Sequence, residues 1–125
     1  MNEEFLHYLW KNKLIINEVF TISGEPLTII QTGSHNIDSG PDFFNGRIKI
    51  GDTIWAGNIE IHVNASDWLN HHHQDDPAYD SIILHVVYNN DKPISRSNGE
   101  LLPTFELKNK FKEDISLRYD TSVNH

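Results

Sequence analysis

The stretch SIILHVVY, residues 81–88, constrains the fold of this chain more than any other segment. Only His85 interrupts its apolar character. A near-continuous apolar run of this length is typical of a strand buried on both faces in the middle of a sheet. We therefore expect residues 81–88 to form a central strand.

Two strands that precede this run form a predicted hairpin. FFNGRIKI (43–50) alternates apolar and polar residues, and TIWAGNIEIHV (53–63) follows it after the tight-turn signal Gly51-Asp52. Successive side chains of a strand point to opposite faces. Ile61 therefore belongs to an apolar face, and Glu60 and His62 share the opposite face.

The remaining elements predict an α+β fold. Residues 3–13 have the pattern of an amphipathic helix, LTIIQ (27–31) that of a strand, and a short helix is expected to begin near Ser66. We predict one domain over residues 1–125, with a mixed, mainly antiparallel sheet, an N-terminal helix and a short crossover helix. A mainly-β sandwich is the alternative.

The composition excludes several classes of protein. The chain has no cysteine, so it contains neither disulfides nor thiolate metal sites. No stretch approaches the roughly 20 apolar residues that a membrane span needs, and we expect a cytoplasmic protein that binds no membrane. Ten Lys and Arg against eighteen Asp and Glu give a net charge of −8, which counts against nucleic-acid binding through basic residues alone. A divalent cation held by some of the acids would reverse that local charge.

Histidines are frequent, and a triplet of them precedes two acids in the segment 71–76. Imidazoles and carboxylates are ligands for Zn, Mn or Fe, so His71, His73 and Asp76 are candidate ligands, with Zn²⁺ as one candidate ion. The alternative is a solvated loop that is merely rich in histidine. A small cupin-like barrel would require His71, His73 and His85 to converge.

Asp42, Glu60 and His62 form a second candidate site. Carboxylates on adjacent antiparallel strands can converge at one end of a sheet and hold Mg²⁺ or Mn²⁺. The ion would polarise a phosphoryl group, and His62 would orient or deprotonate the attacking water. His85 would lie nearby if its strand neighbours that of Glu60, and otherwise it is a hydrogen-bonded core residue. The alternative is that Glu60 and His62 form the solvated face of a half-covered sheet.

The order of these features resembles the αβββαβ core of the PD-(D/E)XK nuclease superfamily. The resemblance rests on Pro41-Asp42, the hairpin, Glu60-x-His62, a short helix and strand 81–88. It implies a restriction-endonuclease-like core in which Asp42 and Glu60 bind the metal and His62 stands where the superfamily has a lysine. It also implies a further acid from the N-terminal helix, Glu3 or Glu4.

Two features depart from that superfamily. Histidine in place of lysine makes the charge at position 62 dependent on pH. The residues after strand 81–88 indicate a hairpin with its tip at Asn98-Gly99, where the superfamily has a helix. We therefore expect a nuclease-like domain that is either active or degenerate.

Longer strings carry a closer resemblance. They are MNEEFLHYLW, SHNIDSGPDFFNGRIKIGDTIWAGNIEIHVNASDW, HHHQDDPAYDSIILHVVY and NGELLPTFEL. These strings are similar to the N-terminal part of the bacterial "domain of unknown function 2851" family, found mainly in Bacteroidetes. Because members of that family are longer, the resemblance implies that residues 1–125 are the N-terminal portion of a longer architecture. It implies no particular activity.

Two functions are consistent with these patterns. The first is a metal-dependent phosphodiesterase, a nuclease-like hydrolase that acts on nucleic acid with Mg²⁺ or Mn²⁺. The second is a non-enzymatic β-rich module that binds carbohydrate or protein, with a structural metal or none and with Trp55 and Trp68 as contacts. Parallel pairing of residues 53–63 with residues 81–88 favours the first, and a purely antiparallel sandwich favours the second.

Overall fold

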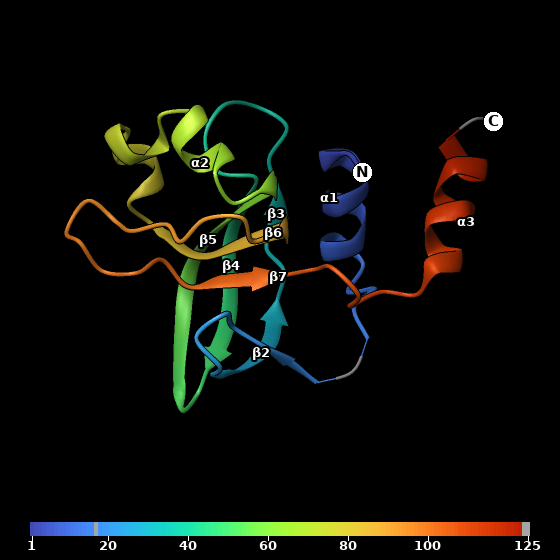
Figure 1. Cartoon of the computed structure of the whole chain (residues 1–125), viewed down its shortest axis with the longest axis horizontal. Helices are drawn as coiled ribbons and strands as arrows, with labels where there is room; N and C mark the ends of the chain where they lie inside the picture. The colour runs from blue at the N-terminus through green and yellow to red at the C-terminus, as the bar shows by residue number, and fades with distance from the viewer. Residues whose placement is uncertain (17, 124–125) are drawn as a thin grey trace.

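The computed structural model describes residues 1–16 and 18–123. Its helices, strands and 3-10 turns (η) are α1 (Glu3–Lys11), β1 (Val19–Phe20), β2 (Pro26–Gln31), β3 (Ser34–His35), β4 (Phe43–Ile50), β5 (Thr53–Asn64), α2 (Asp67–Asn70), η1 (His73–Asp75), η2 (Pro77–Tyr79), β6 (Ile82–Asn89), β7 (Thr104–Glu106) and α3 (Glu113–Val123). Helix α1 lies next to the sheet, α3 lies beside α1 on the side away from the sheet, and α2 lies close to β5 (Figure 1). The predicted N-terminal helix, hairpin and crossover helix are therefore present.

The strands form one mixed seven-stranded sheet in the order β1-β2-β4-β5-β6-β7, with β3 paired to β4. Neighbouring strands from β1 to β5 are antiparallel, whereas β5, β6 and β7 run parallel. The segment with α2, η1 and η2 joins β5 to β6. An α+β fold with a mixed, mainly antiparallel sheet is confirmed. The alternative of a mainly-β sandwich is wrong, because a sandwich needs two packed sheets.

The sheet curls until its first and last strands are nearly joined. The amide of Ile22, just after β1, donates to the carbonyl of Thr104 in β7 at 2.9 Å, so the sheet is nearly barrel-shaped. Strand β3 is a short addition to the same sheet beside β4. Ser34 and His35 pair there with the start of β4.

Helix α1 covers one face of the sheet. Its apolar stripe, consisting of Phe5, Leu6, Leu9 and Trp10, is buried in the main core together with Ile59 and Ile61 of β5. The side chain of Asn2 accepts a hydrogen bond from the Phe5 amide at 2.9 Å and so caps the first turn. This packing brings the first turn of α1, with its acids, close to the sheet.

The opposite face carries a second apolar cluster around Trp68, which is 3% exposed. Strand β6 contributes Ile82 and Val87 to this cluster and Leu84 and Val86 to the main core, so it is buried on both faces as predicted. The expectation that Trp68 contacts a sugar or partner at the surface is wrong, because α2 packs this side chain into the interior.

The segment between β6 and β7 contains the predicted turn but not a return strand. Gly99 adopts a φ of +88°, and an antiparallel bridge between Ser95 and Leu101 flanks the turn. The chain then enters β7 parallel to β6. None of the helices in the described part of the chain is long and apolar enough to cross a membrane.

Candidate metal centre

Strand β5 is the element around which the candidate site is built. Its side chains alternate between the two faces as predicted: Ile59 and Ile61 belong to the main core, and Glu60 and His62 face the other way. Glu60 and His62 are nevertheless 4% and 1% exposed, so the alternative of a solvated sheet face is wrong. The segment that joins β5 to β6 covers these polar side chains, with His71 and His73 packed against His62. Glu60 and His62 therefore require partners within the protein.

Asp42 and Glu60 lie side by side, although 18 residues separate them in the chain. The Asp42 amide donates to Glu60 Oε1 at 3.1 Å, and Asp42 Oδ2 accepts from the Ile61 amide at 2.8 Å. The bonds form because Asp42 immediately precedes β4, whose Phe43 pairs with Ile59 of β5. Both carboxyl groups thus meet at one position beside the sheet.

The two carboxyl groups share one negative charge in the absence of a cation. Burial, followed by the charge of Asp42, raises the pKa of Glu60 to about 10. Burial alone would also raise the pKa of Asp42, but its interactions with the nearby His7 and Glu60 and the hydrogen bond from the Ile61 amide hold it below its ordinary value. At neutral pH Asp42 is ionised and Glu60 is protonated. A divalent cation is the partner that would allow both groups to ionise.

Helix α1 adds a third acid and an imidazole to this position. Glu3 and His7 are four residues apart and share one helix face. Together with Asp42 they offer ligand atoms that all lie within 4.8 Å of one another. His7 Nε2 is 3.6 Å from Asp42 Oδ2, and His7 Nδ1 lies 3.1 Å from His35 Nε2.

The helix therefore provides Glu3 rather than Glu4, which is exposed. Burial and then the charge of Asp42 raise the pKa of Glu3. Sequence reasoning missed His7 and His35. The spacing of Glu3 and His7 on one face of a predicted helix was a usable signal for His7, whereas no spacing in the sequence points to His35.

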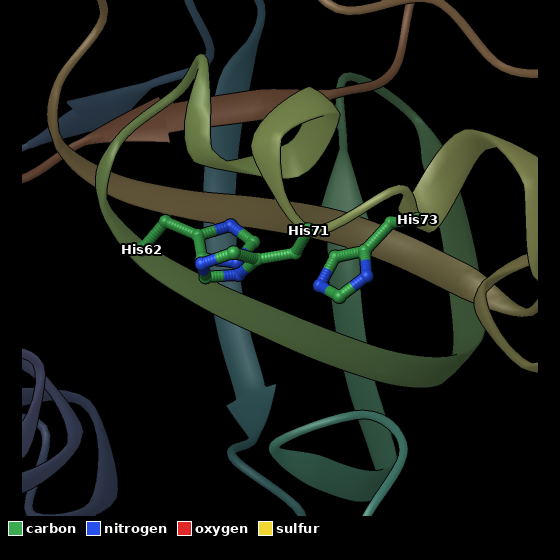
Figure 2. Close-up of side chains that lie close together, drawn as sticks. All are labelled: His62, His71 and His73. Carbon is green, nitrogen blue, oxygen red and sulfur yellow. The ribbon is translucent and has the colours of Figure 1, made fainter.

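On the other side of Glu60, three histidines converge. Figure 2 shows His62 from β5 beside His71 and His73, which follow α2. One ring nitrogen from each lies within 4.8 Å of the others. Glu60 Oε2 is 2.7 Å from His73 Nε2 and 3.5 Å from His62 Nε2. This group could hold a metal ion.

His85 supports His62 rather than joining the other two histidines. Parallel pairing sets Glu60 opposite His85, and His62 Nδ1 lies 2.7 Å from His85 Nε2. The prediction that His85 neighbours Glu60 and His62 is confirmed. A cupin-like set of His71, His73 and His85 is not formed, because His62 takes the third position among the described residues.

The buried imidazoles are neutral at physiological pH. Burial, followed by the proximity of the other histidines, lowers the pKa of His62 to about 2. For the same reasons the pKa of His73 falls to about 4 and that of His85 to about 3. Neutral imidazole is the form that binds metal ions, so these side chains are ready as ligands.

Several ring nitrogens at this site lack the partners that buried polar atoms normally have. Among the described residues, His7 Nε2, His73 Nε2 and His85 Nδ1 are buried without a hydrogen bond. The 2.7 Å contact between His73 and Glu60 therefore brings two polar atoms together without hydrogen-bond geometry. Such unpaired nitrogens fit a cation between imidazole and carboxylate groups.

The remaining candidate, Asp76, lies outside the cluster. Its side chain caps η2 by accepting from the Ala78 amide at 2.9 Å, and the residue is exposed. His72 is also exposed and adopts a left-handed φ of 58°. The left-handed residue separates His71 from His73 and turns the chain so that both neighbours reach His62.

The fold and this cluster define an α+β protein in which His62, His71 and His73 could together hold a metal ion. The chain belongs to the family described as "Protein of unknown function (DUF2851)", whose model matches residues 3–125. No curated protein and no solved structure gives a significant match.

Proposed function

We propose that this protein is a metal-dependent phosphodiesterase with a nuclease-like core, in which Asp42 and Glu60 hold Mg²⁺ or Mn²⁺. The observation that carries the proposal is the close approach of the half-buried Asp42 to the buried Glu60, whose Oε1 accepts from the Asp42 amide, with Glu3 and His7 beside Asp42. Oxygen-rich sets of this kind are the ones that hard divalent ions prefer. Zn²⁺ is the alternative ion where imidazoles contribute.

The topology supports this proposal. Helix α1, the antiparallel strands β2, β4 and β5, the crossover with α2 and the parallel strand β6 follow in the order αβββαβ. Parallel pairing of β5 with β6 was the arrangement expected for a nuclease-like sheet and not for a β-rich binding module. The proposed restriction-endonuclease-like core consists of these elements.

The proposed roles of the residues follow from their protonation states. When bound, the ion would neutralise phosphate charge and polarise the phosphoryl group. Asp42 is already ionised, whereas Glu60 must release its proton to act as a ligand. His62 has a pKa near 2 because it is buried, so it accepts a proton poorly and would orient water rather than deprotonate it.

The substrate class that this chemistry favours is a phosphodiester, including nucleic acid. With a net charge of −8, the protein cannot attract a polyanion through overall charge. Binding would therefore depend on the cation held by the acids. We expect cleavage to require added metal and to disappear in the presence of a chelator.

The test compares cleavage of DNA and of bis(p-nitrophenyl) phosphate by wild type and Glu60→Gln, with Mg²⁺ or Mn²⁺. Glutamine reproduces the neutral, protonated side chain and should leave the fold intact. We expect the cleavage rate to fall by at least about 100-fold, because the variant lacks a carboxylate ligand of the ion that stabilises the charge of the transition state. Glu100→Gln changes an exposed glutamate and should retain full activity. Equal cleavage by wild type and Glu60→Gln, or no metal-dependent cleavage by wild type, would contradict the proposal.

A further inference from the structure

We propose that His62, His71 and His73, together with Glu60 Oε2, form a second metal site that selects Zn²⁺ over Mg²⁺. This site stands on the geometry of the imidazoles and does not depend on hydrolytic activity. Its role as the second ion of a two-metal phosphodiesterase rests on the function proposed above. Glu60 would then lie between the two ions.

The ligand atoms already occupy the space around one point. All three imidazoles offer a nitrogen within 4.8 Å of the other two. Zn–N bonds near 2.0–2.1 Å in tetrahedral geometry would place these nitrogens about 3.3 Å apart. Rotation of the exposed His71 side chain can close the remaining difference, while His62 and His73 are held by the surrounding protein.

Glu60 is the fourth ligand of the proposed site. Its Oε1 accepts the amide hydrogen of Asp42 at 3.1 Å and thus belongs to the carboxylate site. Its Oε2 faces His73 Nε2 at 2.7 Å and His62 Nε2 at 3.5 Å. One carboxylate therefore reaches both sites, as bridging acids do in two-metal hydrolases.

His85 orients the His62 ligand. If His62 Nδ1 donates to His85 Nε2 across their 2.7 Å contact, His62 Nε2 is left with a lone pair that faces Glu60. Metal-ligating histidines commonly use their second nitrogen in this way. On the other side, the His73 ring stacks on Tyr79 with centroids 3.6 Å apart, which limits its rotation.

A hydrogen-bonded core of histidines does not account for the same observations. His73 is 8% exposed, and its Nε2 has no hydrogen bond within the described part of the chain. A buried polar atom without a partner is costly, and a cation would satisfy it. Because three of the four ligands are imidazole nitrogens, the set favours Zn²⁺ and does not suit Mg²⁺, which binds oxygen.

The test is a titration of the metal-free chain with Zn²⁺ by calorimetry, with Co²⁺ absorption as an independent probe of tetrahedral coordination. His71→Asn removes an exposed ligand, so folding should be unaffected. We expect its Zn²⁺ affinity to fall by at least about 100-fold, since even loss of a supporting residue costs 10–100-fold. His72→Asn is the matched control, because His72 is the adjacent exposed histidine and asparagine tolerates its left-handed φ. This control should bind Zn²⁺ like wild type.

A third variant separates this proposal from the hydrolase. Asp42→Asn should lose Mg²⁺- or Mn²⁺-dependent cleavage and still bind Zn²⁺ at the histidines. If wild type binds no Zn²⁺, or if His71→Asn binds it as tightly as His72→Asn does, the histidine site is disproved, whatever the cleavage assay gives. If Zn²⁺ binds as expected but cleavage is absent, the proposed activity alone fails.

Discussion

Individual acids at this site differ in charge because of their surroundings rather than their chemistry. Asp42 receives hydrogen bonds that favour the ionised form, whereas Glu60 is buried against that same charge and keeps its proton. Two like charges in a protein interior cannot both persist without a counter-ion. The pair is therefore more stable as carboxylate and carboxylic acid until a cation binds.

Two adjacent acids of α1 provide a test at the residue scale. Glu3→Gln should raise the concentration of Mn²⁺ needed for half-maximal cleavage by about 10-fold or more, because Glu3 lies with His7 and Asp42 at the carboxylate site. Glu4→Gln makes the same change one residue along, at an exposed position, and should have no effect. The measurement is the cleavage rate of both variants as a function of Mn²⁺ concentration. A larger effect for Glu4→Gln would exclude the assigned position of Glu3.

Among the elements, β5 and β6 determine whether the site exists. Their backbones approach closely at Gly57, where an added Cβ would lie 2.5 Å from Ile83 Cγ2 and 2.8 Å from the Ser81 carbonyl. The register of the two strands shifts between Asn58 and Ile59, just beyond this contact. Glycine at position 57 therefore permits the pairing that sets Glu60 opposite His85.

We expect Gly57→Ala to destabilise the fold by about 1–3 kcal/mol, the usual cost of overpacking, and to weaken Zn²⁺ binding by displacing β5. Gly99→Ala is the comparison. A Cβ added at position 99 would meet no atom within 4 Å. The expected loss of stability, about 1–2 kcal/mol, therefore comes from the left-handed backbone alone, and Zn²⁺ binding should be retained. Urea denaturation and Zn²⁺ titration give the two measurements. Wild-type stability and affinity in Gly57→Ala would show that β5 and β6 do not need this close approach.

For the whole molecule, the buried histidines and the buried Glu60 make the free energy of unfolding depend on pH in opposite directions. His62, His73 and His85 have folded pKa values of about 2, 4 and 3, below the ordinary 6.5, because burial disfavours their charged forms. Below pH 6.5 the unfolded chain binds their protons and the folded chain does not, so stability falls as the pH falls. Glu60 has the opposite effect: its pKa rises from 4.5 to about 10, so its contribution is complete below pH 4.5 and is lost as the pH rises toward 10.

The metal-free protein should accordingly be most stable near pH 6.5, the ordinary histidine value. Three histidines outweigh one glutamate below this pH, and we expect a loss of about 2–4 kcal/mol between pH 6.5 and pH 5. Glu60→Gln should remove the decline on the alkaline side and leave the acid side in place. Urea denaturation in a chelator across this pH range is the measurement. A stability that is constant from pH 5 to pH 8 would contradict the assigned protonation states.

Local patterns in the sequence were sufficient for β2, β4, β5 and β6 and for the direction of the side chains of β5, but not for the two-residue strands β1 and β3. The alternation around Ile61 predicted that Glu60 and His62 leave the apolar face, and the unbroken run 81–88 predicted a strand buried on both sides. Both follow from the two-residue period of a strand, which depends only on neighbouring residues. In the structure, the parallel pairing of β5 with β6 places His85 beside His62.

The sequence by itself thus determined the α+β elements, the family and the inward face of β5. Only the tertiary structure decided which distant groups contact His62 on the polar face of β5, and which contact Asp42. The path of the crossover brings His71 and His73 over His62, and the packing of α1 brings His7 to Asp42. No periodicity encodes such meetings, because they depend on how connections run and on which faces pack together.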